Sequence, residues 1–156
     1  MIVSRFIVSD TRTVRLLIVE DSPIYLYLIQ RAFQSRPGKV RWELTVAEDG
    51  AQALHLLFEE EEESAPLPNL ILLDWNLPKV SGDEVLRRIK EHQKLRRIPV
   101  LVFSSSEAEE DIHAAYDNHA NGYITKPESN SDVLAAIVET IEEFWVAVAQ
   151  LPKVMR

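Results

Sequence analysis

The sequence predicts an α/β fold, a doubly wound five-stranded parallel sheet with helices on both faces. The first observation is that short apolar runs alternate with segments of helical periodicity, which gives five strand–helix units. The second is that the connections between these units are only a few residues long, as in right-handed crossovers over a parallel sheet. The third is the apolar run at 70–73, which is typical of a strand buried on both faces.

Composition and charge limit the class of protein. At 156 residues one domain is expected, and 46% hydrophobic with 27% charged residues is usual for a globular protein. The net charge of −8 argues against a nucleic-acid partner. No apolar run approaches the ~20 residues that span a bilayer, and the N-terminus lacks the pattern of a secretory signal, so no membrane partner is expected. Cysteine is absent, which fits a cytoplasmic location.

Five segments have the apolar patterns of strands. Most are short continuous runs, whereas the second alternates apolar and polar side chains like a half-covered strand. In chain order, the expected strands are residues 14–19, 40–46, 70–73, 98–103 and 123–125.

The intervening segments carry helix start signals and apolar stripes. Ser22 is a suitable N-cap before Pro23, and Ser106 with Glu109 fits a capping box. The expected helices are residues 23–35, a segment after Gly50 with Ala53, Leu54, Leu57 and Phe58 on one face, and residues 83–92, 107–118 and 131–148. These bounds give an N-terminal extension at 1–13, a domain at 14–150 and a C-terminal tail at 151–156.

Polar residues follow four of the five strands. The carboxyl ends of parallel strands share one rim, which would then hold three carboxylates, a hydroxyl and an ammonium, those of Glu20, Asp21, Asp74, Ser104 and Lys126. Three acids in one cleft repel one another unless a cation is present, and oxygen ligands are those that Mg²⁺ prefers. A lysine and a hydroxyl can hold phosphoryl oxygens. The set therefore suits phosphoryl transfer to a carboxylate.

Other kinds of site fit the sequence less well. The chain has no glycine-rich phosphate loop, which disfavours the usual nucleotide-binding folds. Its four histidines fall on expected helices or a helix end, away from the rim, and no Ser–His–acid arrangement can be placed.

The ordered set of rim residues resembles the receiver domains of two-component response regulators. Each motif is weak by itself, whereas the set in this order is specific. The resemblance covers about residues 14–150 and is carried by Glu20-Asp21, Asp74 with Leu77-Pro78 and Gly82, Ser104 and Lys126-Pro127. It implies the sheet order 2-1-3-4-5 of flavodoxin-like and receiver-like folds.

A narrower resemblance is to the single-domain regulators paired with bacterial and cyanobacterial phytochromes. It is carried by the long acidic and proline-containing loop before the third strand, by the stretch from Asp74 to Lys79, and by Phe144-Trp145 followed by Gln150-Leu151-Pro152. The implied partner is a sensor histidine kinase, with a phytochrome as the first candidate.

The resemblance also implies a role for each rim residue. Asp74 would accept a phosphoryl group from a phosphohistidine of the kinase, and Lys126 and Ser104 would contact its oxygens. The implied ligands of Mg²⁺ are Glu20, Asp21, Asp74 and the backbone carbonyl of Asn76.

The resemblance further implies a switch rather than an enzyme. Ser104 moving onto the phosphoryl group would free space into which Tyr123 could rotate, which would change a protein-interaction surface. The peptide bond between Lys126 and Pro127 is expected to be cis.

The sequence leaves three alternative functions open. The protein could pass its phosphoryl group onward as a phosphorelay intermediate, or it could be a docking adaptor that is never phosphorylated. Repelling carboxylates would serve no purpose in such an adaptor. A haloacid-dehalogenase-like phosphatase would carry a second Asp two residues after the first, where this chain has Asn76.

The last expected helix has apolar residues beyond the length that a five-stranded sheet needs to be covered. We expect the later ones to form a two-fold homodimer interface with the C-terminal arm. The residues concerned are Phe144, Trp145, Val148 and Leu151. The alternative is that Phe144 and Trp145 only cover the protein's own core.

Overall fold

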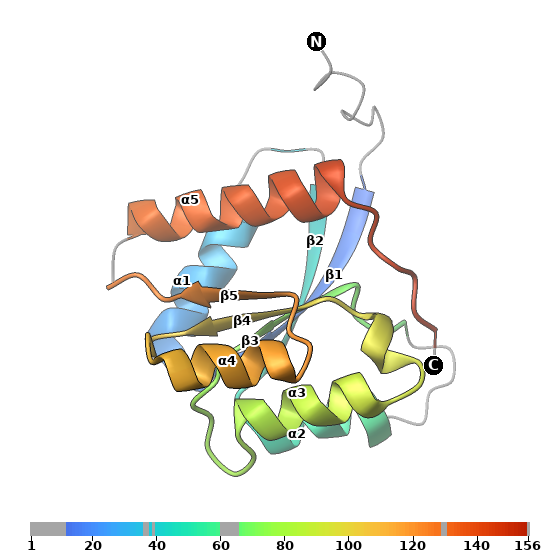
Figure 1. Cartoon of the computed structure of the whole chain (residues 1–156). Helices are drawn as coiled ribbons and strands as arrows, with labels where there is room; N and C mark the ends of the chain where they lie inside the picture. Colours follow the sequence, from blue (N-terminus) through green and yellow to red (C-terminus); the bar gives the residue numbers. More distant parts are fainter. Residues whose placement is uncertain (1–11, 36–37, 39, 60–65, 129–130, 156) are drawn as a thin grey trace.

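The computed structural model describes residues 12–35, 38, 40–59, 66–128 and 131–155. It confirms the predicted fold class, because five parallel strands form one sheet in the order β2-β1-β3-β4-β5 (Figure 1). The strands are β1 Arg12–Val19, β2 Val40–Ala47, β3 Leu70–Leu73, β4 Val100–Ser104 and β5 Gly122–Thr125. The expected N-terminal extension lies mostly outside the described residues, and β1 begins two residues earlier than predicted.

In the described part of the chain, five α-helices connect and follow the strands. They are α1 Pro23–Gln34, α2 Gly50–Leu54, α3 Gly82–Glu91, α4 Glu109–Asp117 and α5 Ser131–Ile141. Two of them continue with wider π-helical turns, α2 into η2 (His55–Glu59) and α5 into η4 (Glu142–Val148), and a short 3₁₀ turn η3 (Leu95–Arg97) follows α3. None of the helices in the described part of the chain combines the length and apolar composition needed to cross a membrane.

The sheet separates two apolar cores. Because side chains alternate along a strand, β3 sends Ile71 and Leu73 to one face and Leu70 and Leu72 to the other. Helices α2, α3 and α4 pack on the first face, and α1 and α5 on the second. All four residues of β3 are buried, as the continuous apolar run predicts.

The predicted capping box at the start of α4 is wrong. Helix α4 begins at Glu109, and Ala108 is its N-cap without a side-chain hydrogen bond. Ser106 instead donates its hydroxyl to Asp111 Oδ2 at 2.5 Å and accepts from the backbone N–H of Ala108. The residue stands two positions too early to cap the helix, so its hydroxyl orders the loop instead.

The apolar stripe predicted for the last helix is split between two faces. Leu134, Val138 and Ile141 are buried, whereas Phe144 and Val148 are 52% and 55% exposed. The cause is the π-helical segment, in which Ala149 N–H bonds to the Phe144 carbonyl five residues back and so changes the helical phase. Trp145 packs against the core under α1 and α5, so the expectation that both aromatics stand clear of the protein's own core is wrong for Trp145.

The segment after η4, residues 149–155, crosses from α5 to the opposite side of the sheet, and we call it the C-terminal arm (Figure 1). Its Pro152 carbonyl accepts a hydrogen bond from the Asn69 side chain, and Val154 is buried in the core that α2 and α3 cover. Asn69 also accepts the N–H of Arg15. The arm is therefore fixed to its own domain, and Leu151 is half-buried in it.

Candidate functional site

The predicted rim residues meet at the carboxyl ends of β1, β3, β4 and β5. Backbone hydrogen bonds between neighbouring strand ends set their register, from Asp74 N–H to the Val19 carbonyl and from Lys126 N–H to the Ser104 carbonyl. One carboxylate oxygen each of Glu20, Asp21 and Asp74 lies within 4.8 Å of the others. Glu20 and Asp74 are buried, and Asp21 is exposed. The parallel register thus places together side chains that are up to 106 positions apart (Lys126 and Glu20).

The Lys126 ammonium lies between the two buried carboxylates. Its Nζ is 2.7 Å from Glu20 Oε2 and 3.1 Å from Asp74 Oδ2. Burial lowers the pKa of Lys126, but the hydrogen bond to Glu20 and the charges of both acids outweigh burial and raise it. Lys126 therefore stays an ammonium near neutral pH.

The two buried acids carry more negative charge than Lys126 neutralises. Burial is the largest influence on Glu20 and Asp74, and it raises the pKa of both above their usual values despite the nearby ammonium. A cation bound among these oxygens would favour their ionised forms. The residues present thus fit a divalent ion with oxygen ligands.

Asn76 enters the site through its backbone. Its N–H and that of Trp75 both hydrogen-bond to the Asp74 carboxylate and lower the pKa of Asp74. The carbonyl of Asn76 stays a predicted metal ligand.

Gly82 allows the chain to turn tightly behind Asp74. Its N–H donates to the Trp75 carbonyl at 2.9 Å, and a Cβ at this position would stand 2.3 Å from the Asp74 carbonyl oxygen. No side chain fits there without moving the backbone that carries Asp74. In the sequence, Gly82 is marked only as one of the residues that carry the family resemblance.

A second glycine supports the loop between β3 and α3. A Cβ on Gly50 would stand 1.9 Å from the Val80 carbonyl oxygen. The preceding Lys79 has a φ of 65°, and its Nζ is 3.1 Å from Asp49 Oδ2. The start of α2 and the loop after Asp74 are thus packed directly on each other, a contact that no motif in the sequence predicts.

Ser104 and Tyr123 are joined through the loop before α4. The buried Ser104 hydroxyl accepts the N–H of Ser106 at 3.2 Å, and the Tyr123 hydroxyl donates to the Ser106 carbonyl at 2.8 Å. Tyr123 is half-buried against the core that α2, α3 and α4 cover. In this structure the Tyr123 hydroxyl is already bound to the loop. The inward rotation expected of Tyr123 would therefore have to break this hydrogen bond.

The expectation of a cis peptide between Lys126 and Pro127 is wrong, since no peptide bond between described residues is cis. The trans form is the one that an X–Pro bond favours by about 0.5–1 kcal/mol.

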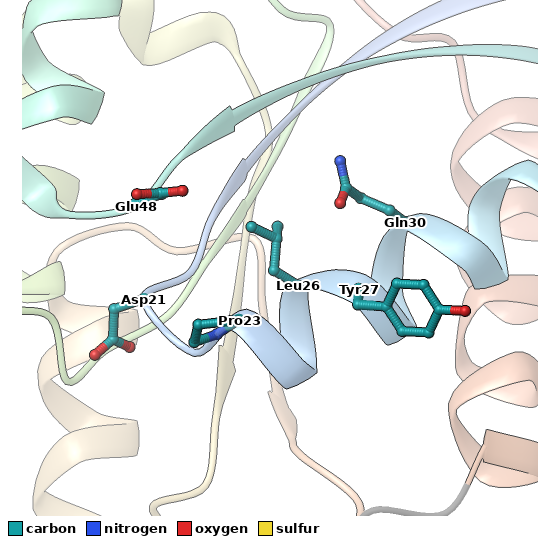
Figure 2. A pocket seen from close by; sticks show the side chains of 6 residues that line it. All are labelled: Asp21, Pro23, Leu26, Tyr27, Gln30 and Glu48. Carbon is teal, nitrogen blue, oxygen red and sulfur yellow. The ribbon is translucent and has the colours of Figure 1, made fainter.

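A pocket of about 180 Å³ opens beside Asp21 at the start of α1 (Figure 2). Asp21 and Glu48, from the loops after β1 and β2, give it two carboxylates, and residues of α1 supply the rest of its wall. The lining residues are Asp21, Pro23, Leu26, Tyr27, Gln30 and Glu48.

Comparison with known proteins agrees with this geometry. Residues 16–138 match the family model described as response regulator receiver domain. The chain is 42% identical over 138 residues to response regulator Rcp1 of Synechocystis sp., covering 88% of this chain and 92% of Rcp1. It is also 42% identical over 133 residues to the probable methanogenesis regulatory protein FilR2 of Methanothrix harundinacea, covering 84% of this chain and 83% of FilR2.

Two solved structures are similar over nearly their whole length. The Mn²⁺-bound form of Rcp1 has a TM-score of 0.79 at 41% identity and covers 89% of this chain and 99% of its own. The phosphorylated cyanobacterial phytochrome response regulator RcpA has a TM-score of 0.81 at 44% identity and covers 90% of this chain and 99% of its own. The family resemblance seen in the sequence is thereby confirmed, and the chain belongs to the response regulator receiver domain family.

Proposed function

We propose that this protein is a response regulator that accepts a phosphoryl group on Asp74 from a sensor histidine kinase, with Mg²⁺ bound beside it. The observation that carries the proposal is the position of Lys126, which lies within 3.1 Å of Asp74 and 2.7 Å of Glu20 at the shared ends of the strands. Two buried acids, one exposed acid and one ammonium form a compact site for a metal and a phosphoryl group.

The proposed transfer gives a role to every group of the site. An oxygen of Asp74 attacks the phosphorus of a phosphohistidine, forming the O–P bond as the N–P bond to the imidazole breaks. The metal, held by Glu20, Asp21 and Asp74, would neutralise charge on the transferred group. The Lys126 ammonium and the Ser104 hydroxyl stabilise the remaining phosphoryl oxygens.

A phytochrome is the proposed kinase partner because similar chains include a phytochrome response regulator. The pocket beside Asp21 and the exposed α1 residues Ile24 and Tyr27 form a surface next to the reacting carboxylate. Its apolar wall and acidic end suit a partner helix with apolar and basic side chains.

The test of the proposed function is phosphorylation by acetyl phosphate and by candidate kinases. The parent should gain one phosphoryl group with Mg²⁺, and Asp74→Asn should gain none because its amide cannot act as the nucleophile. Intact-mass analysis in acid measures the product, and Asp83→Asn is a matched control because Asp83 is an exposed acid of α3 bound to Asn118. A parent that is never labelled favours the docking adaptor, and phosphoryl transfer onward to a histidine phosphotransfer protein identifies a relay.

The metal assignment predicts a specific effect of Asp21→Asn. This variant should weaken Mg²⁺ binding about tenfold or more, because one ligand charge is lost from an all-oxygen site. Fluorescence of Trp75, which is buried next to Asp74, can follow the titration. Glu48→Gln is the control, since Glu48 is an acid of the same pocket but not of the three-acid cluster. Equal affinities of parent and Asp21→Asn would remove Asp21 from the site.

We also propose a homodimer that uses the exposed end of the last helix. Phe144 and Val148 are the large exposed apolar residues there, and the Phe144 ring stacks edge-on against Trp145 at 5.2 Å between centroids. A patch of this kind can meet its own copy across a two-fold axis.

The dimer predicts that Phe144→Glu/Val148→Glu is a folded monomer, because charge replaces the exposed apolar patch without touching the buried face. Light scattering at tens of micromolar, with and without phosphorylation, measures the mass of parent and variant. Tyr116→Glu, an exposed aromatic of α4, is the control and should keep the parent's mass. A parent that is monomeric in both states excludes the dimer.

A further inference from the structure

We infer that Tyr25 is a positioning residue for Lys126, whose ring keeps the ammonium in the site when the neighbouring carboxylates turn toward a metal ion. This inference rests on the proposed function, and it concerns a residue of α1 that the sequence analysis does not single out. Tyr25 stands four positions after Asp21, in the first turn of the helix.

Two contacts tie Tyr25 to the residues after β5, and a third joins it to β4. The Lys126 Nζ lies 4.8 Å from the centroid of the Tyr25 ring, within the range of a cation–π interaction. The Tyr25 hydroxyl donates to the Pro127 carbonyl. The ring also meets Phe103 edge-on, at 6.2 Å between centroids and 70° between planes, and the Phe103 centroid is itself 5.9 Å from Nζ.

The start of α1 fixes the direction of this side chain. Ser22 caps the helix by accepting the N–H of Tyr25, and Pro23 occupies the first turn. Tyr25 then packs against the core under α1 and α5, whereas Tyr27, two positions later, is 60% exposed. The Tyr25 ring is thus held against both Phe103 and the Lys126 ammonium.

A metal ion and the Lys126 ammonium would compete for the same carboxylates, and the ring contributes to this competition. In this structure Glu20 and Asp74 attract the ammonium, but a divalent cation bound to the same oxygens would compete for them and repel it. The attraction of the Tyr25 ring does not depend on those carboxylates. The hydroxyl contact to Pro127 in addition holds the backbone next to Lys126. The ring is therefore the group that keeps the ammonium near Asp74, where the phosphoryl oxygens would arrive.

Two variants separate the ring from the hydroxyl. Tyr25→Phe keeps the ring and loses the contact to Pro127, and Tyr25→Leu loses both. The first readout is the NMR shift of the Lys126 Hε protons in the metal-free, unphosphorylated protein, which a ring face moves upfield. We expect the upfield shift in the parent and in Tyr25→Phe, and its loss in Tyr25→Leu.

The second readout is the rate of phosphorylation by acetyl phosphate at saturating Mg²⁺. Tyr25→Leu should react roughly three- to tenfold more slowly, the size expected for loss of one cation–π contact in a buried site. Tyr25→Phe should stay within about twofold of the parent. Tyr116→Leu controls for loss of a tyrosine elsewhere and should react like the parent.

The outcomes distinguish this inference from the proposed function. A Tyr25→Leu variant that is folded and reacts at the parental rate overturns it, as does a Tyr25→Phe variant as slow as Tyr25→Leu. Absence of the upfield shift in the parent also overturns it. In Asp74→Asn the upfield shift should persist although no phosphoryl group is accepted, so failure of phosphorylation and failure of the ring contact are seen separately.

Discussion

Lys126→Met is expected to destabilise the metal-free protein by about 3 kcal/mol near neutral pH, because it leaves two buried carboxylates without their counter-charge. The side chains of Lys126 and Asp74 are only 7% and 6% exposed, so solvent screens this loss little. Urea unfolding with a chelator measures the change. Mg²⁺ should restore most of the lost stability, since the cation takes over the neutralising role.

The pH dependence of this variant has a definite sign. Burial already raises the pKa of Glu20 and Asp74, and a carboxyl group with a raised folded-state pKa contributes stability that is present at low pH and lost as pH rises through that pKa. Lys126→Met should therefore approach the stability of the parent as pH falls and differ most from it as pH rises. Asp74→Asn should do the opposite of Lys126→Met and stabilise the metal-free protein, because it removes the surplus charge.

The control for charge removal is Lys79→Met. Lys79 pairs with Asp49 at 3.1 Å but is 68% exposed, so its loss should cost less than about 1 kcal/mol. If Lys126→Met costs no more than Lys79→Met, or if its cost is independent of both pH and Mg²⁺, the neutralising role of Lys126 is wrong.

Gly50→Ala is the second substitution with a large expected effect, about 3 kcal/mol of lost stability. The new methyl would stand 1.9 Å from a backbone oxygen, that of Val80, so the backbone has to move rather than a side chain. Thermal unfolding gives the change in stability. Because Val80 belongs to the loop that follows Asp74, the same variant should also slow phosphorylation by acetyl phosphate.

Gly38→Ala provides the matched comparison. Its added methyl would meet Glu142 Oε1 at 3.2 Å, which is a side-chain atom rather than a backbone atom and is farther away. We expect its cost to stay below about 1 kcal/mol. Equal stabilities of the two alanine variants would show that the contact between Gly50 and Val80 is not tight in solution.

The rim of the sheet could be predicted because it depends on the order of short apolar runs. Asp74 and Lys126 each follow such a run directly, and a parallel sheet leaves only one edge at which they can lie. The direction of the strands alone determines this position.

Other features depend on how two distant segments approach each other. The closeness of Gly50 to Val80 follows from packing of α2 on the loop after β3, and a glycine in the sequence does not specify its neighbour. The π-helical turns of η4 change which residues face the core, so a periodicity of 3.6 residues assigns Trp145 and Phe144 to one face when they lie on two. Tyr25 has no signal beyond its residue type.

The C-terminal arm has a mechanical consequence for the domain. It joins the end of α5, on one face of the sheet, to Val154, which lies with Leu67 and Leu95 in the core of the other face. The Val146 carbonyl of η4 accepts from Arg12, and the Pro152 carbonyl of the arm accepts from Asn69, so η4 and the arm are tied to the amino ends of β1 and β3. The helices on the two faces of the sheet should therefore open as one unit. In amide hydrogen exchange, the protection of η4 and that of the η3 region should rise and fall together. We expect a displacement of α5 to be carried to the opposite side of the sheet past the amino ends of β1 and β3, rather than through the sheet.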